Sequence, residues 1–432
     1  MFLEHRERFL ARLERERAAA VIPTGALRIR NHDSEYRFRP ASDFWYLTGF
    51  KEPDAVLVLA PANAGAKSVL FVNEKDREAE TWTGRRLGSA AAPTALGVAR
   101  AHPLGELWTQ LPELVAGHER VVFGFGQDAA FDARLLECAA GWQQKSRAPR
   151  PVPRAWVEPA LWLHEQRLKK DEAELACMRQ AARISAEAHL AVMRAGRPGT
   201  NEGELDALLD YTFRRRGGTG SAYGNIVAGG DGACILHYRE NDRALVAGEL
   251  CLVDAGCEYD FYASDVTRTF PVAGKFSGEQ RALYELVLAA LERALACVRP
   301  GSDQDQVHDA AVVTLVDGLL ELGLLTGTRA EALETKSYRR FYMHRTGHWL
   351  GLDVHDCGLY TQNEKPRPFE PGMVTTVEPG LYVAPDDESV EARWRGIGIR
   401  IEDDVLVTAA GHEVLTAGIP RTVAEVEAAC ER

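Results

Sequence analysis

Two short strand-like runs that each carry an aspartate constrain this chain more than any other feature. The apolar run 250–253 ends at Asp254, and the run 266–270, rich in β-branched and aromatic residues, follows Asp265. A tight turn at residues 259–260 predicts a hairpin in which the two aspartates are directly opposed, with their Cβ atoms about 5 Å apart. Carboxylates that close repel each other unless they share a proton or bind a cation. The alternative is a pairing shifted by one residue, which would let both acids reach solvent.

Size and composition describe a globular protein of two domains. At 432 residues the chain is too long for one ordinary hydrophobic core. Its 46% hydrophobic and 26% charged residues are typical of globular proteins. The formal net charge of −12 argues against a general nucleic-acid-binding surface. No apolar run approaches the roughly 18 residues that a membrane span needs, so no membrane partner is expected.

The cysteines and the N-terminus indicate a cytoplasmic protein. The eight cysteines include no C-x-x-C pair, which favours reduced thiols over a disulfide framework or a zinc site. Residues 1–20 mix arginine and glutamate without an apolar core, so we expect neither a secretory signal nor a transit peptide.

Residues 1–155 are predicted to form a smaller α/β domain. An opening helix is followed by strand-like runs at residues 44–47, 55–60, 68–72 and 120–125. Residues 81–88 are interpreted as a loop that carries Trp82. The proline-rich segment 148–153 sustains neither a helix nor a central strand, and it therefore predicts a domain boundary near residues 150–160.

Residues 160–432 are predicted to form a larger α/β domain. Helices start at Asp171 and Asn201, each with a glutamate three positions later in a capping-box pattern. Strands at 223–228 and 234–238 and the aspartate hairpin follow this pair of helices. Two further helices over 278–298 and 303–323 precede the remaining strands. The repeated order of two helices and then strands suggests a duplicated α/β half.

The last hundred residues supply further histidines and acids. His344 and His348 have the spacing of a zincin helix, but no glutamate lies between them, and the glycines at 347 and 351 argue against a helix. Glu378 ends a β-rich run before Pro379-Gly380. In the alternating run 396–405, Gly398, Arg400 and Glu402 share one face, which the glycines leave open; a plain ion pair between Arg400 and Glu402 is the alternative.

Five of these residues form a candidate metal site. Four carboxylates and one imidazole suit hard divalent ions such as Mn²⁺, and their number suits two ions bridged by shared carboxylates. The five residues are Asp254, Asp265, His348, Glu378 and Glu402.

Several segments resemble a known family of metallopeptidases. Four stretches are similar to the metal-ligand motifs of the superfamily of methionine aminopeptidase, aminopeptidase P and prolidase; they read Asp-Ala-Gly-Cys-Glu-Tyr with Ser-Asp-Val-Thr-Arg-Thr-Phe, His-Trp-Leu-Gly-Leu-Asp-Val-His-Asp, Val-Glu-Pro-Gly-Leu-Tyr, and Gly-Ile-Gly-Ile-Arg-Ile-Glu-Asp-Asp. The N-terminal segments Asp-Phe-Trp-Tyr-Leu-Thr-Gly-Phe and Trp-Thr-Gly-Arg-Arg-Leu-Gly resemble bacterial aminopeptidase P. The resemblance covers nearly the whole chain.

This resemblance implies a "pita-bread" catalytic domain with a dinuclear site, usually manganese, that releases an N-terminal residue preceding proline. It implies that the five residues above bind metal and that His237 and His355 hold the substrate and the developing oxyanion. Tyr382 and Arg400 would orient groups around the metals, and His344 would contact the substrate. Trp82, Asp33 and Arg167 match further substrate-binding positions. The resemblance also implies a homodimer or homotetramer in which the N-terminal domain restricts access. Arg345 departs from the family pattern, where small residues are usual.

The expected chemistry is metal-assisted hydrolysis. Two cations lower the pKa of a shared water to give hydroxide near neutral pH, which attacks the polarised scissile carbonyl. Glu378 can relay the proton to the departing amine, and His355 can donate to the oxyanion. The alternatives are a prolidase restricted to dipeptides, a metal-free peptide-binding module and a creatinase-type C–N hydrolase. The presence of all five ligand residues favours the metalloenzyme.

Overall fold

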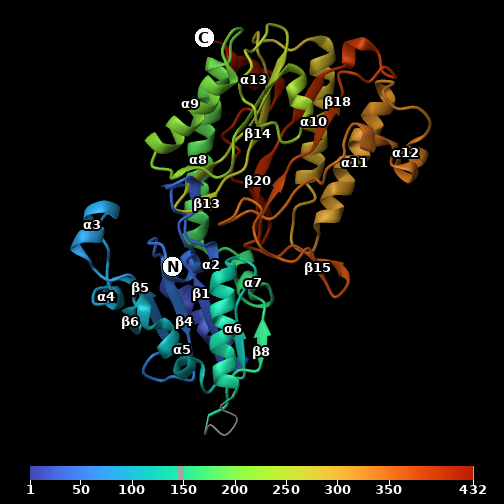
Figure 1. Cartoon of the computed structure of the whole chain (residues 1–432). Helices are drawn as coiled ribbons and strands as arrows, with labels where there is room; N and C mark the ends of the chain where they lie inside the picture. Colours follow the sequence, from blue (N-terminus) through green and yellow to red (C-terminus); the bar gives the residue numbers. More distant parts are fainter. Residues whose placement is uncertain (145–149, 432) are drawn as a thin grey trace. The chain divides into compact units, whose positions relative to one another are not determined.

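The computed structural model describes residues 1–144 and 150–431, which form two compact units, Met1–Arg167 and Leu168–Arg432 (Figure 1). Each unit has its own hydrophobic core. Within the described residues, no helix is long and apolar enough to cross a membrane.

The first unit is built on one mixed six-stranded sheet in the order β6-β5-β4-β1-β7-β8. β4 runs antiparallel to β1 and β5, and the remaining neighbours are parallel. The strands of the unit are β1 (Ala18–Pro23), β4 (Val56–Leu59), β5 (Ser68–Val72), β6 (Arg100–Pro103), β7 (Arg120–Val122) and β8 (Ala155–Val157), with a separate ribbon of β2 (Ile29–Asn31) and β3 (Ser34–Glu35).

Helices surround this sheet (Figure 1). They are α1 (Phe2–Arg15), α2 (Ser42–Thr48), α3 (Arg77–Thr83), α4 (Ala92–Leu96), α5 (Leu107–Val115), α6 (Ala129–Gln143) and α7 (Leu163–Leu168), with the 3₁₀ helices η1 (Leu104–Glu106) and η2 (Pro159–Leu161). α5 and α6 supply Leu111, Leu135 and Trp142 to the core on one face of the sheet.

One prediction for the first unit is wrong, and another holds only in part. Residues 44–47 form the middle of α2, not a strand, and the helix ends where Gly49 adopts a left-handed conformation (φ 66°). All four side chains of this run are buried, so the segment lacks the polar face that reveals a helix in sequence. Of the loop predicted over residues 81–88, residues 84–88 are irregular as predicted, but residues 81–83 with Trp82 end α3, which begins where the Asp76 carboxylate accepts the N–H of Ala79.

The proline-rich segment is part of the first unit rather than its end. The carbonyl of Pro151 accepts the N–H of Gly117, and Arg154 N–H donates to the carbonyl of Glu119, so the chain enters β8 directly from the prolines. The units divide after Arg167, C-terminal of the predicted boundary. Residues 148 and 149 of the predicted linker lie outside the described residues.

The second unit places strands between two pairs of helices, α8 with α9 and α10 with α11 (Figure 1). Its helices are α8 (Glu172–Ala195), α9 (Glu202–Arg215), α10 (Gly278–Leu295), α11 (Gln304–Glu321), α12 (Arg329–Thr335) and α13 (Val423–Cys430), with the 3₁₀ helices η3 (Gly230–Cys234), η4 (Ser337–Arg340) and η5 (Ala392–Trp394).

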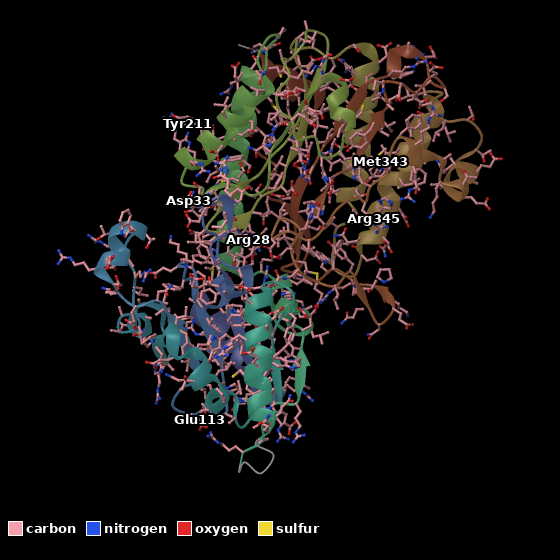
Figure 2. The ribbon with its side chains drawn as sticks, viewed as in Figure 1. Arg28, Asp33, Glu113, Tyr211, Met343 and Arg345 are labelled. Carbon is pink, nitrogen blue, oxygen red and sulfur yellow. The ribbon has the colours of Figure 1, made fainter. Side chains whose placement is uncertain are left out.

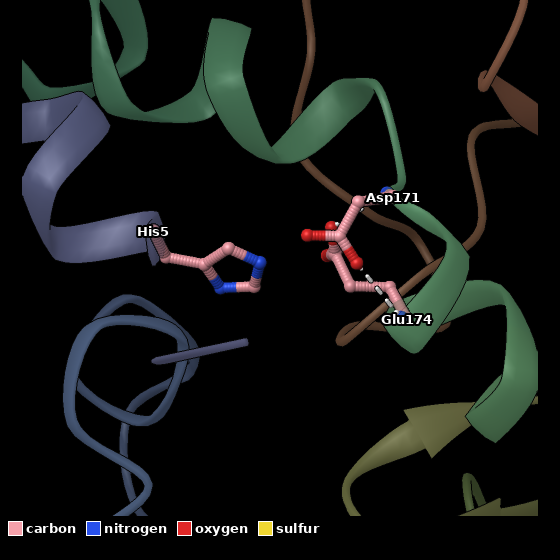
Figure 3. Close-up of side chains that lie close together, drawn as sticks. All are labelled: His5, Asp171 and Glu174. Atoms are coloured by element: carbon pink, nitrogen blue, oxygen red, sulfur yellow. Dashed lines mark hydrogen bonds between the residues drawn. The ribbon is translucent and has the colours of Figure 1, made fainter. Parts of the chain in front are cut away.

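The predicted helix starts are confirmed. Asp171 and Glu174 form a reciprocal capping box at the start of α8, drawn with its hydrogen bonds in Figure 3. Asn201 and Glu204 form another at the start of α9. Each box satisfies backbone N–H groups that the first helical turn leaves without partners.

The strands of the second unit form several small sheets, in the orders β10-β11-β14, β13-β12-β9, β17-β20-β21, β18-β19 and β15-β16. They are β9 (Gly220–Ser221), β10 (Ile226–Gly229), β11 (Leu250–Asp254), β12 (Cys257–Tyr259), β13 (Tyr262–Ala263), β14 (Thr267–Pro271), β15 (Thr361–Gln362), β16 (Lys365–Pro366), β17 (Val374–Val377), β18 (Gly380–Val383), β19 (Ile397–Arg400), β20 (Asp403–Thr408) and β21 (Gly411–Val414).

Hydrogen bonds connect β14 to the chain around β19. Thr269 Oγ1 lies 3.0 Å from the carbonyl oxygen of Arg400, and Glu402 N–H donates to the carbonyl of Thr267. These contacts place the segment before β14, which carries Asp265, next to the segment after β19, which carries Glu402.

Two strand predictions in this unit need correction. Residues 234–238 do not form a strand, because Cys234 ends η3 and the chain then turns. The predicted strand 396–405 is interrupted at Ile401–Glu402, between β19 and β20. A Cβ at Gly398 would lie 2.3 Å from the carbonyl oxygen of Ala233, so the face expected to be open at this glycine is occupied by η3.

Candidate metal centre

The aspartate hairpin forms with a register two residues away from the predicted one. Asp254 pairs with Thr267, and the turn lies at Asp260–Phe261, whose positive φ angles of 46° and 66° suit a type I′ turn. The two aspartates are therefore not directly opposed. They still face the same side, because a shift of two residues preserves the alternation of side chains.

A tyrosine hydroxyl joins these two acids. Tyr223 Oη lies 2.6 Å from Asp254 Oδ1 and 2.5 Å from Asp265 Oδ1, so that its single proton can be donated to either carboxylate. Both aspartates are buried. One hydroxyl oxygen therefore contacts both carboxylates. The two acids are thus as close together as a shared cation site requires.

Asp265 is also fixed through its backbone. Its N–H donates to both oxygens of the buried Asp404 (3.1 and 3.2 Å), and Ser264 Oγ donates to the same carboxylate. Gly256 allows the hairpin to close, because a Cβ there would lie 1.6 Å from the carbonyl oxygen of Ser264.

His348 lies on an irregular segment beside β17, as expected from its glycines. Its N–H donates to Thr376 Oγ1 at 3.0 Å, and its carbonyl accepts the N–H of Thr376. The ring Nδ1 lies 3.0 Å from the carbonyl of Trp349 and so carries the proton, which leaves Nε2 as a ligand atom. Nε2 lies 3.3 Å from Asp265 Oδ2 and 3.8 Å from Glu378 Oε1.

Glu402 and Arg400 complete the cluster from the end of β19. Glu402 Oε2 accepts a hydrogen bond from Thr267 Oγ1 (2.6 Å), and Arg400 Nε donates to the same hydroxyl. Arg400 bonds Asp254 Oδ2 at 2.7 Å rather than Glu402, so the simple Arg400–Glu402 ion pair is not formed. Asp265, His348 and Glu402 each offer a ligand atom within 4.8 Å of the others.

The charges of this cluster are not balanced by the protein. Burial raises the pKa of Asp254, and burial with the charge of Asp265 raises the pKa of Glu402 well above its ordinary value. Burial also raises the pKa of Glu378 to about 7, against the opposing charges of His348 and Arg400. Buried carboxylates that repel each other need protons or cations. This donor set therefore fits divalent metal ions.

A hydrogen-bonded chain runs along one side of the cluster. Arg400 Nη1 donates to Tyr382 Oη (3.0 Å), which lies 2.9 Å from His344 Nε2. His344 Nδ1 lies 2.7 Å from the carbonyl of Arg345, so Nδ1 is the donor and Nε2 accepts from Tyr382. Burial and the charge of Arg400 lower the pKa of His344 to about 4, which keeps the ring neutral.

The two remaining histidines lie near the cluster without joining its carboxylates. The His355 ring packs edge-on against His348, with centroids 4.3 Å apart and planes at 81°. Burial lowers the pKa of His355, and the charges of His348 and His237 lower it further. His237 lies on an exposed turn after η3.

The substrate-binding residues predicted in the first unit have varied surroundings. Trp82 is 84% exposed on α3, and Asp33 is exposed in the β2–β3 turn (Figure 2). Arg167 is buried and donates to Asp43 Oδ1 at 2.7 Å. Burial would raise the pKa of Asp43, but Arg167 and His164 lower it to about 2. A substrate role for these three residues stays a prediction.

The sequence did not predict the hydroxyl groups that form hydrogen bonds around the metal centre, which belong to Tyr223, Thr267 and Thr376. Thr267 could have been found from its place two residues after Asp265 on a strand, where it shares a face with that acid. Tyr223 lies outside every motif and has no such signal.

Arg345, labelled in Figure 2, is exposed and pairs with Asp305 at the start of α11.

Family models and relatives agree with this geometry. Residues 176–409 match the model of metallopeptidase family M24, and residues 2–123 match the aminopeptidase P N-terminal domain. The chain belongs to metallopeptidase family M24. The M24 domain and the smaller N-terminal α/β domain confirm the expected fold class.

Relatives of this M24 chain match it over nearly its full length. Xaa-Pro aminopeptidase of Escherichia coli (strain K12) is 45% identical over 412 residues, which cover 95% of this chain and 93% of that protein. The structure of Pseudomonas aeruginosa aminopeptidase is 48% identical, with a TM-score of 0.96, covering 99% of this chain and 97% of that one. Zn-substituted E. coli aminopeptidase P in complex with product is 43% identical, with a TM-score of 0.95 and the same coverage.

Proposed function

We infer that this protein is a metal-dependent aminopeptidase that hydrolyses the bond between an N-terminal residue and a proline at the second position. The observation that carries this inference is the convergence of four carboxylates and one imidazole in an M24 domain. Relatives named Xaa-Pro aminopeptidase match both the M24 domain and the N-terminal domain, which supports peptide substrates with proline second.

We propose that Asp254, Asp265, His348, Glu378 and Glu402 hold two divalent ions. Mn²⁺ suits this set best because four of the five side chains offer hard oxygen ligands. When bound, such ions supply Lewis acidity and lower the pKa of a water molecule. The Tyr223 and Thr267 hydroxyls form hydrogen bonds with these carboxylates and so fix their orientation.

The remaining residues are proposed to move protons and hold the substrate. The Glu378 carboxylate lies between His348 and His344 (3.8 and 3.9 Å), where it can pass a proton to the departing proline nitrogen. His355 and His237 can donate to the oxygen of the scissile carbonyl. Burial and the charge of Arg400 keep His344 neutral beside this carboxylate, where it can contact the peptide while Tyr382 bonds its Nε2.

Further predictions rest on the family resemblance. Trp82, Asp33 and Arg167 are proposed to contact substrate, and the first unit to restrict access. The resemblance also supports a cytoplasmic homodimer or homotetramer; light scattering of the purified protein would measure the assembly.

Metal analysis combined with peptide hydrolysis tests the proposed function. After chelation and reloading with Mn²⁺, we expect about two ions per chain and cleavage of an Xaa-Pro-Xaa tripeptide. The matched Xaa-Ala-Xaa tripeptide should remain intact. A protein that binds no metal and cleaves neither peptide would be a binding module, and one that cleaves only the Xaa-Pro dipeptide would be a prolidase.

A further inference from the structure

The segment that carries His237 depends on its neighbours for its position. Residues 230–249, here called the His237 loop, connect β10 to β11, the strand that ends at Asp254. Across the described part of the chain, no group forms a hydrogen bond with the His237 ring, and the residue is exposed. The position of this imidazole therefore depends on the backbone that carries it.

Tyr238 fixes that backbone immediately after His237. Its side chain is 8% exposed and packs in a small apolar cluster with Ala233 of η3 and with Ile226, Ala228 and Leu252 of β10 and β11. Its hydroxyl donates to Glu202 Oε2 at 3.0 Å. Burial and the hydrogen bond to Glu202 raise the pKa of Tyr238 to about 12, so the hydroxyl remains a donor.

Glu202 is a fully buried acid with three donors. It is the first residue of α9, where the helix dipole favours a negative charge. Its Oε1 accepts the N–H of Gly229 at 2.7 Å, and its Oε2 accepts the N–H of Arg243 at 3.0 Å in addition to the Tyr238 hydroxyl. One carboxylate therefore connects α9, the end of β10 and two points of the His237 loop.

Further hydrogen bonds, made by Asn241 and Arg243, hold the rest of the His237 loop. The Asn241 side chain accepts the N–H of Val227 and donates to the carbonyl of Asn225, which satisfies the free edge of β10. Arg243 forms two hydrogen bonds with the Glu249 carboxylate. Hydrogen bonds thus hold the loop after His237 at Tyr238, Asn241 and Arg243, although the histidine ring itself makes no hydrogen bond to the described residues.

We propose that Tyr238 and Glu202 are positioning residues for the hydrolysis, which hold His237 against the metal centre so that its imidazole can contact the substrate carbonyl. This inference rests on the proposed function. Strand pairing supports it, because β10 pairs with β11 such that Ile226 lies opposite Asp254. The cluster that holds Tyr238 therefore shares its strands with a proposed metal ligand.

A double-mutant cycle tests whether Tyr238 acts through His237. Tyr238→Phe removes one hydroxyl and keeps the packed ring, so kcat/KM should fall about tenfold with metal content unchanged. In the His237→Ala background, the same substitution should change kcat/KM by less than about twofold, because the group that it positions is gone. An equal loss in both backgrounds, or no loss in either, would overturn the proposal.

Two further variants separate positioning from stability. Tyr284→Phe removes a similarly buried hydroxyl, which donates to the carbonyl of Arg421, and should lower the melting temperature without changing kcat/KM. Glu202→Gln keeps the side-chain volume, and its effect on kcat/KM should also disappear in the His237→Ala background. A Glu202→Gln effect that persists there would contradict a role through His237.

Hydrogen exchange distinguishes a failure of this inference from a failure of the proposed function. Amide exchange in peptides covering residues 235–240 should accelerate in Tyr238→Phe and stay unchanged in Tyr284→Phe, whatever the reaction of the enzyme. Unchanged exchange in Tyr238→Phe would overturn the positioning role. Wild-type protein that cleaves no Xaa-Pro peptide would instead overturn the proposed function.

Discussion

At the scale of single residues, neutral hydroxyl groups hold most of the acids in the metal centre. The Tyr223 hydroxyl contacts both Asp254 and Asp265, and Thr267 donates to Glu402. Arg400 contacts the cluster directly, through Asp254. Hydroxyl donors orient carboxylates without neutralising their charge, so the cluster retains its attraction for divalent ions.

We expect Asp265→Ala or Glu402→Ala to abolish peptide hydrolysis while the fold is retained. Each residue is proposed to be a metal ligand, so its loss would remove a carboxylate from the site and weaken metal binding. Metal content should fall with activity, and circular dichroism should stay unchanged. Asp210→Ala, which removes a surface partner of Arg214, is the matched control and should preserve both metal and rate. Wild-type turnover by either site variant in excess Mn²⁺ would contradict the dinuclear assignment.

Substitution of His355 and His348 should give different results. His355→Ala should keep its metals and lose about 10²- to 10³-fold in rate, because it removes an oxyanion donor. His348→Ala should lose metal and rate together, and added Mn²⁺ should partly restore both. Metal content, melting temperature and rate are measured on both variants. A His355→Ala protein that loses metal as His348→Ala does would place His355 among the ligands.

At the scale of elements, close backbone contacts bring the ligand-bearing segments together. A Cβ at Gly256 would lie 1.6 Å from the carbonyl oxygen of Ser264, and one at Gly347 would lie 2.1 Å from the carbonyl oxygen of Thr376. Neither glycine has a positive φ, so close packing, not backbone conformation, excludes a side chain at these positions.

Gly256→Ala should therefore open the aspartate hairpin. The clash is with backbone, which has little freedom to move, so we expect a loss of about 1–3 kcal/mol in stability. Weaker Mn²⁺ binding should accompany it, because Asp254 and Asp265 would separate. Denaturant unfolding and metal titration measure the two effects. Gly278→Ala at the open start of α10 is the control, and it should be neutral or slightly stabilising.

At the scale of the whole molecule, buried neutral histidines make folding sensitive to acid. His189 of α8 is fully buried, with Nε2 at 2.8 Å from the carbonyl of Ala255. Burial lowers its pKa from 6.5 to about 4. Between these values the unfolded chain binds a proton that the folded protein does not, so stability falls as pH falls from 6.5 to 4.

His189→Gln should flatten this part of the stability curve. The glutamine amide can still donate to the carbonyl of Ala255 but does not titrate, so up to about 3 kcal/mol of pH dependence should disappear. The free energy of unfolding, measured between pH 7 and 4 on metal-free protein, gives the slope for each variant. The exposed His32 serves as the control, and His32→Gln should leave the slope as in the wild type. Equal slopes in all three proteins would show that His189 is not the group responsible.

The sequence alone determined the features that local physics controls. Capping boxes at Asp171 and Asn201 are visible in sequence because both partners lie within one helical turn. The pattern of acids and histidines likewise named the five candidate ligands, and the family resemblance agreed with that set, since each residue lies in a short motif. The aspartate hairpin was predicted as an element, but its turn was placed one residue too early.

Tertiary structure decided what depends on distant neighbours. Residues 44–47 form a helix because the surrounding core buries every side of the run, and apolar runs of that length are ambiguous in sequence. Tyr223 reaches Asp265 across 42 positions, and the Tyr238 hydroxyl reaches Glu202 across 36. Local propensity and periodicity extend over a few residues only. Contacts at such separations arise when helices and strands pack, and packing is therefore what selects the hydroxyl groups around the metal centre.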